Sequence, residues 1–127
     1  MKTTFIISCI IFSMSLTGCA KDPKVVTDSI MKAYSQLVTS LDAKTSCEDA
    51  TKKVIELNDS SIETIRTILN DFNGLSRDNK LNVIEELTKQ AKELNKQYWV
   101  PFNKRCTSHS PQIGRIIGGF MRRFGVE

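Results

Sequence analysis

The chain has 127 residues, a length that corresponds to one small domain. Its composition, 40% hydrophobic, 25% charged and 7% aromatic with only six Gly and three Pro, excludes a disordered or collagen-like chain and is compatible with a modest packed core. The formal net charge of +4 is too small to indicate a nucleic-acid-binding protein, and we expect no nucleic-acid partner.

The N-terminus has the features of an export signal. Lys2 supplies a short positive region, and the apolar stretch that follows, 5–16, suits a signal peptide but is too short to span a bilayer. This stretch ends in Leu16-Thr17-Gly18-Cys19, which resembles the lipobox of bacterial lipoproteins. The resemblance implies that residues 1–18 are removed and that Cys19 becomes a lipid-modified N-terminus.

The same resemblance implies a location in the cell. Lipoproteins retained in the inner membrane carry Asp after the lipidated Cys, whereas this chain has Ala20, which implies an outer-membrane anchor with the domain facing the periplasm. Residues 19–24 would then be a short tether that keeps the domain close to its membrane. Ordinary signal peptidase cleavage after Gly18-Cys19-Ala20 is the alternative, and it would release a soluble protein. In either case the mature chain is exported.

Two cysteines of the exported chain are expected to form a disulfide. Cys9 is removed with the signal and Cys19 is assigned to lipid, which leaves Cys47 and Cys106. An exported pair of thiols is usually a disulfide, and a redox-active pair usually shows C-x-x-C spacing, which this pair lacks.

The spacing of apolar residues predicts helices, and no segment shows strand-like alternation. A first helix is expected to start at Thr27 or Asp28 and to bury one face. A turn at 43–46 leads into a second helix, whose stripe continues through the middle of the chain. The first face consists of Val26, Ile30, Ala33, Leu37 and Leu41, and the second of Ala50, Val54, Leu57, Ser61, Ile65, Ile68 and Phe72.

Turn residues then predict where the second helix ends and the third begins. Asn73-Gly74 is a stop signal in which Gly can take the left-handed cap conformation. Ser76 is expected to cap the next helix, with Asp78 in its first turn, and Pro101 is expected to end it. The third apolar stripe consists of Leu81, Ile84, Leu87, Ala91, Leu94 and Tyr98.

These elements predict an all-α fold. Two antiparallel helices hinged at 73–74 bring Cys47 and Cys106 to the same open end, because each cysteine lies at a comparable distance from the hinge. We therefore expect a small up-down helical bundle, with a disulfide-closed domain at 25–111 and a C-terminal segment at 112–127.

The C-terminal segment has the pattern of a basic amphipathic helix. From residue 104 to 127 there are five basic residues and one acidic residue, so the positive excess of the chain lies here. Apolar residues recur at helical spacing, with arginines opposite or at the flank. The segment could be a fourth helix of the bundle, a helix that fills a groove in a partner protein, or a helix that lies on a membrane. The apolar residues are Ile113, Ile116, Ile117, Phe120, Met121 and Phe124.

Candidate binding residues follow from this segment and from one aromatic patch. In the patch at 98–102, Trp99 lies one step off the core stripe, and it either closes the open end of the bundle or forms part of a binding surface. The candidates for contact with a partner or a membrane are Trp99, Arg115, Ile116, Phe120, Met121, Arg122, Arg123 and Phe124.

No motif for catalysis, metal binding or a cofactor is apparent. His109 lies in a Ser-rich break and is expected to be a solvated loop residue. Glu85 and Glu86 are expected to be surface charges paired with Lys89 and Lys92. The interpretation is therefore a non-enzymatic, lipid-anchored interaction protein of the cell envelope, with an envelope protein as partner, by analogy with pilotin-like chaperones or immunity and exclusion factors. A small helical carrier of lipid or haem is the alternative, and direct action of the tail on a membrane is a third possibility.

Overall fold

The computed structural model describes residues 22–127. The expected signal peptide, the lipid site Cys19 and the sorting residue Ala20 lie outside the described residues. Within the described part of the chain there is no strand, so the predicted all-α class is confirmed. No helix in this part is both long enough and apolar enough to cross a bilayer. The elements are α2 (Pro23–Thr39), α3 (Cys47–Ser60), α4 (Ile62–Asn73), α5 (Arg77–Leu94), the π-helical turn η1 (Asn95–Trp99), α6 (Val100–Arg105) and α7 (Ser110–Arg122).

Side-chain caps fix where the long helices begin. The carboxylate of Asp22 accepts a hydrogen bond from the backbone N–H of Lys24 at 2.8 Å, so α2 starts at Pro23, earlier than the predicted Thr27 or Asp28. Residues 23 and 24, expected in the tether, thus belong to a helix. Ser76 caps α5 as predicted, since its hydroxyl accepts from the N–H of Asn79 at 3.2 Å.

The second predicted helix is divided into α3 and α4, so its expected continuity is wrong. The hydroxyl of Ser60 donates to the carbonyl of Leu57 at 3.3 Å, and that of Ser61 donates to Asn58 at 3.2 Å. Consecutive serines bonded to the preceding turn compete with the helical hydrogen bonds and bend the chain. The end of α4 at Asn73 is confirmed, but Gly74 has φ −78° and does not adopt the left-handed conformation.

Pro101 does not end the third helix, contrary to prediction. The helix instead widens into η1 just before the proline, and the N–H of Val100 donates to the carbonyl of Asn95, five residues back. An α-helix would place the proline ring against the carbonyl four residues earlier, and a π-turn changes that spacing. The chain therefore continues directly into α6, with Pro101 in its first turn.

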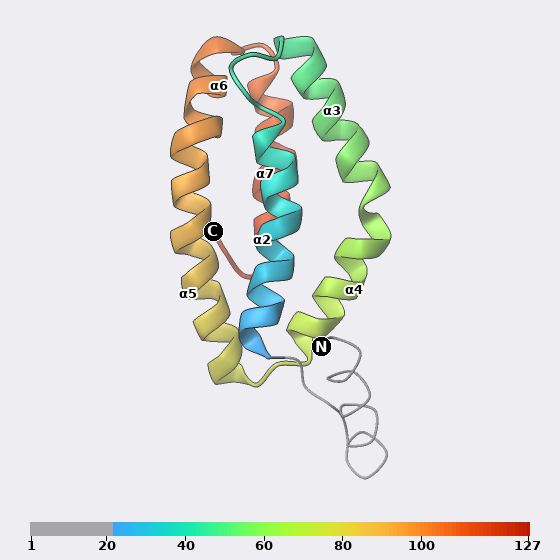
Figure 1. Cartoon of the computed structure of the whole chain (residues 1–127), viewed down its shortest axis with the longest axis vertical. Helices are drawn as coiled ribbons and strands as arrows, with labels where there is room; N and C mark the ends of the chain where they lie inside the picture. The colour runs from blue at the N-terminus through green and yellow to red at the C-terminus, as the bar shows by residue number, and fades with distance from the viewer. Residues whose placement is uncertain (1–21) are drawn as a thin grey trace.

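The helices run up, down, up and down, with α7 as the fourth arm (Figure 1). Helix α2 is central: it packs against α3, α4, α5, η1 and α7. The predicted hairpin is present, but α2 lies between its two arms, because α3 and α4 contact α2 on one side and α5 contacts it on the other (Figure 1). The bundle is thus built around the helix nearest the predicted anchor.

Most predicted core positions are buried, with one error of register. In α5, Leu81 is 55% exposed and Val83 is only 1% exposed. At the start of this helix the buried face therefore includes Val83 and not the predicted Leu81. The core of the described residues is a single cluster that includes residues from every α-helix. The segment 112–127 is therefore part of the same folded unit as 25–111.

Candidate functional site

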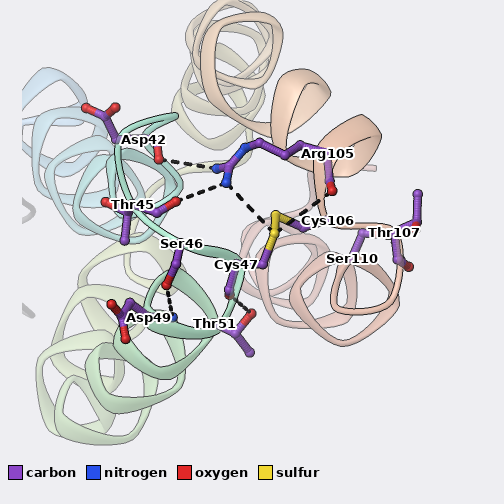
Figure 2. The surroundings of a disulfide bond; sticks show 10 residues. All are labelled: Asp42, Thr45, Ser46, Cys47, Asp49, Thr51, Arg105, Cys106, Thr107 and Ser110. Carbon is purple, nitrogen blue, oxygen red and sulfur yellow. Dashed lines mark hydrogen bonds between the residues drawn. A yellow bond between two sulfur atoms is a disulfide. The ribbon is translucent and has the colours of Figure 1, made fainter.

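The disulfide between Cys47 and Cys106 is confirmed. It joins the first residue of α3 to the end of α6 across 59 residues of sequence, with the two Cα atoms 5.6 Å apart. As Figure 2 shows, it lies where the α2–α3 loop, α3 and the end of α6 meet. This end of the bundle is opposite the start of α2 (Figure 1).

Arg105 forms a second link at the same end of the bundle. Its guanidinium donates to the backbone carbonyls of Thr45 at 3.0 Å and Asp42 at 3.3 Å, and one of its nitrogens lies 3.8 Å from the Cys47 sulfur (Figure 2). One side chain thus ties the α2–α3 loop to α6 beside the disulfide. No sequence pattern indicates this link, since the acceptors are backbone atoms of a loop about 60 residues earlier in the chain.

The C-terminal candidates are divided between the core and the surface. Phe120 and Phe124 are at most 1% exposed, and Phe124 meets the ring of Phe72 edge to face at 5.6 Å. Phe120 lies 5.7 Å from the ring of Tyr34. Met121 is 5% exposed. Of the three alternatives for this segment, the fourth helix of the bundle is the one observed, so Phe120 and Phe124, which were candidate binding residues, are core residues and not part of an exposed binding face.

A groove of about 540 Å³ lies between α5 and α7. It exists because α5 and α7 each pack closely against α2 but approach each other much less closely. We call it the α5–α7 groove. We call the continuous run of α5, η1 and α6 the third arm. The groove is lined by Tyr34 of α2, by Thr88, Ala91, Lys92, Asn95, Lys96, Trp99 and Val100 of the third arm, by Gly114, Ile117, Gly118, Met121 and Arg122 of α7, and by Val126 and Glu127.

Three basic side chains border this groove, and all are exposed. Lys92 and Lys96 lie one helical turn apart on one wall, and Arg122 lies on the other. Among the described residues none of the three has an ion pair; the expected partner of Lys92, Glu86, instead accepts a hydrogen bond from Gln90 at 2.9 Å. Glu127 is the one acidic residue in the lining. The groove therefore has a positive charge excess.

The π-turn η1 shapes the floor and one end of the groove. Its first residue, Asn95, accepts a hydrogen bond from the Tyr34 hydroxyl at 2.6 Å, and burial raises the pKa of Tyr34 to about 12. Its last residue, Trp99, is half-buried against α7. A Cβ on Gly114 would lie only 3.2 Å from the Trp99 ring, so the glycine allows this close packing. Trp99 thus both packs against α7 and lines the groove.

The remaining candidates lie on the other side of α7. Arg115, Ile116 and Arg123 line a separate hollow of about 390 Å³, together with Asn58 of α3. Of the predicted binding residues, the structure therefore brings Trp99, Met121 and Arg122 to one groove and places Arg115, Ile116 and Arg123 elsewhere.

His109 is not the solvated loop residue that was expected. It is partly buried at the start of α7, and its Nδ1 has no hydrogen-bond partner among the described residues. It borders a shallow hollow on α3 with Glu48, Lys52 and Glu56. No group of three or more potential metal ligands converges in the described part of the chain.

Sequence reasoning missed the role of Lys92, Lys96 and Asn95. Their helical periodicity was visible, but the groove that they line depends on how far α7 diverges from α5. Comparison with known proteins gives no further guide: no protein family, no curated protein and no solved structure matches the chain.

Proposed function

We propose that the protein is a lipid-anchored binding protein of the bacterial cell envelope, and that the α5–α7 groove is its binding surface for an envelope protein. The observation that carries the proposal is this groove, in which three cations that have no ion pair among the described residues border an apolar floor. Aromatic and Arg side chains beside apolar surface are typical of protein interfaces, and cations without ionic partners favour an anionic partner.

The scaffold behind the groove supports a binding role. The disulfide and Arg105 fix one end of the bundle, and the Tyr34–Asn95 hydrogen bond ties the groove wall to the central helix. A wall held in this way loses little conformational entropy when a partner binds. The disulfide also agrees with an exported chain, since such bonds persist in oxidising compartments.

The proposed anchor sets the orientation. Only three peptide bonds separate Cys19 from the cap residue Asp22, a reach of about 10 Å. The start of α2 would therefore lie close to the membrane, with the disulfide end farthest from it. The groove runs alongside the helices, so it would be open to a partner beside the anchored domain.

Site-specific photocrosslinking in the native envelope tests the proposed surface. A photoreactive residue at Lys96, in the groove, is compared with one at Thr64, exposed on α4 across the bundle. We expect a distinct protein adduct from position 96 and none from position 64. Equal labelling from both positions, or no protein adduct at 96, would contradict the proposal. Cys19→Ala should release the protein into the soluble fraction if the anchor is correct.

A small-ligand carrier is the second candidate, because 540 Å³ is within the usual range for small-molecule sites. Mass spectrometry of an organic extract of the purified protein tests it. A stoichiometric lipid or a haem absorbance, lost when Gly118→Leu fills the groove, would favour the carrier over the binding protein.

A further inference from the structure

We propose that the partner segment bound in the α5–α7 groove is an acidic amphipathic helix; this rests on the proposed binding function and names the chemistry of its partner. The charge of the groove favours an acidic occupant. Lys92 and Lys96 are neighbours on one helical face, an arrangement that is mildly destabilising in the free protein. Arg122 adds a third positive charge from the opposite wall. Carboxylates on both flanks of an occupant would neutralise both walls.

The position of Arg122 also favours a carboxylate in the occupant. A Cβ on Gly118 would lie 3.0 Å from a guanidinium nitrogen of Arg122, so this side chain lies back along α7 over the glycine. The guanidinium lies beside the groove and has no hydrogen bond or ion pair within the described residues. Its fork of N–H donors matches a carboxylate in two-point contact.

The shape of the groove fits a helix. The groove follows the third arm from Thr88 to Val100, about 18 Å along the axis or some three helical turns. Its wall residues Thr88, Lys92, Lys96 and Val100 are exposed, so the groove is open along its length. A small ligand would stay largely solvated there, whereas enclosed sites bury most of a ligand surface. A helix laid lengthwise matches both the extent and the openness.

The floor of the groove fits the apolar face of an amphipathic helix. Ala91 is a small residue on one wall, and Trp99, which is half-buried, supplies apolar surface beside it. Val100, 42% exposed, extends that apolar surface at one end. A helix with apolar residues at i, i+3, i+4 and i+7 would cover this floor and direct acidic residues at both flanks toward the basic walls.

The test uses the full-length chain in neutral phosphatidylcholine vesicles and two designed peptides. One is a helix with Leu at i, i+3, i+4 and i+7 and Glu on both flanks; the other has Lys in place of every Glu. Neither contains Trp, so the emission of Trp99, the single Trp of the chain, reports on the groove alone. We expect the Glu peptide to bind and to shift the Trp99 emission, with an affinity that falls as salt is added. The Lys peptide should bind at least about tenfold more weakly.

Charge reversal locates the binding. The double variant Lys92→Glu with Lys96→Glu should weaken binding of the Glu peptide by about tenfold or more and strengthen binding of the Lys peptide. Arg122→Glu alone should have the same two effects. Arg115→Glu is the matched control, because it makes the same charge change on α7 but lines the other hollow. Circular dichroism confirms that each variant folds.

Three outcomes would overturn the acidic helix: equal binding of both peptides, an equal effect of Arg115→Glu, or binding to phosphatidylglycerol vesicles but to neither peptide. The last outcome would assign the cations to a membrane surface. Photocrosslinking keeps this result separate from the proposed function. A protein adduct at position 96 whose crosslinked segment is neutral, basic or extended would leave the binding function standing and refute the acidic helix.

Discussion

The hydroxyl of Tyr34 donates a 2.6 Å hydrogen bond to the side-chain oxygen of Asn95, which joins the central helix α2 to the first residue of the π-turn η1. Tyr34 is only 1% exposed. The bond therefore satisfies a polar group inside the bundle and fixes the helix widening that precedes Pro101. It also forms the base of the α5–α7 groove, so one contact supports both the fold and the candidate site.

The burial of Tyr34 predicts a loss of stability at alkaline pH. The pKa of Tyr34 is about 12 in the folded chain and about 10 when unfolded, so the unfolded state loses its proton first. Tyr34 therefore contributes stability that is fully present below about pH 10 and is lost as the pH rises toward 12. The free energy of unfolding, measured with denaturant at a series of pH values across this range, should fall as the pH rises, and Tyr34→Phe should reduce that fall.

Tyr98→Phe is the control, because Tyr98 is the other tyrosine of the chain. That variant should keep the fall in stability, and its ultraviolet phenolate absorbance should then report Tyr34 alone with a midpoint near 12. A midpoint near 10 would mean that Tyr34 is solvated. At neutral pH, Tyr34→Phe should cost about 1 kcal/mol, the usual net value of a hydrogen bond.

Local patterns predicted the helices better than their interruptions. Ser76 acts as the expected cap because the cap bond is made to a backbone N–H three residues away. Pro101, by contrast, would end a regular α-helix, but the five-residue π-turn before it removes the conflict. That turn is held by Tyr34, 61 residues earlier in the chain, so no local rule could anticipate it.

The candidate site was predicted only in part, for the same reason. The helical spacing that identified the apolar face of the C-terminal helix is the same whether that face contacts a partner or the protein's own core. In the folded protein this face is buried in the core because it packs against Tyr34 and Phe72, which lie far away in sequence. Arg122 was a correct candidate for an exposed position, whereas the walls supplied by Lys92 and Lys96 required the tertiary arrangement.

The role of α7 as a core helix gives the second prediction. Phe120→Ala should destabilise the protein by about 3–5 kcal/mol, since it removes a fully buried aromatic ring. Arg115→Ala on the exposed side of the same helix should change stability by less than about 0.5 kcal/mol. Deletion of residues 113–127 should abolish cooperative thermal unfolding. A deletion variant with native helicity and a normal transition would show that α7 is dispensable.

The disulfide end gives the third prediction. Cys47→Ser combined with Cys106→Ser should lower the free energy of unfolding by about 4 kcal/mol, because the bond closes a 59-residue loop in the unfolded chain. Arg105→Ala should cost about 1 kcal/mol through loss of its bonds to two loop carbonyls. Arg105→Lys should recover only part of this, since an ammonium lacks the planar fork. Urea titrations of the oxidised proteins measure each value, and full recovery by Lys would contradict the two-carbonyl bridge.

The fourth prediction concerns the end of α7, where the chain turns back toward the groove. The N–H of Gly125 donates to the carbonyl of Arg122 at 3.1 Å and that of Val126 to Met121 at 3.2 Å, the paired bonds of a Schellman cap. Gly125 has φ +80°, and a Cβ there would lie 2.9 Å from Cδ1 of Ile84. Gly125→Ala should therefore cost at least about 1–2 kcal/mol through backbone strain alone.

Gly119 provides the matched control for this substitution. It is a mid-helix glycine, and a Cβ there would meet nothing closer than a nitrogen of Arg122 at 3.8 Å. Gly119→Ala should thus stabilise the protein by about 0.5–1 kcal/mol, because alanine loses less backbone entropy in a helix. Thermal unfolding of the two variants should shift in opposite directions. In the folded chain Val126 is 6% exposed and lines the groove together with Met121. Shifts of the two variants in the same direction would mean that the cap at Gly125 does not hold Val126 in this position.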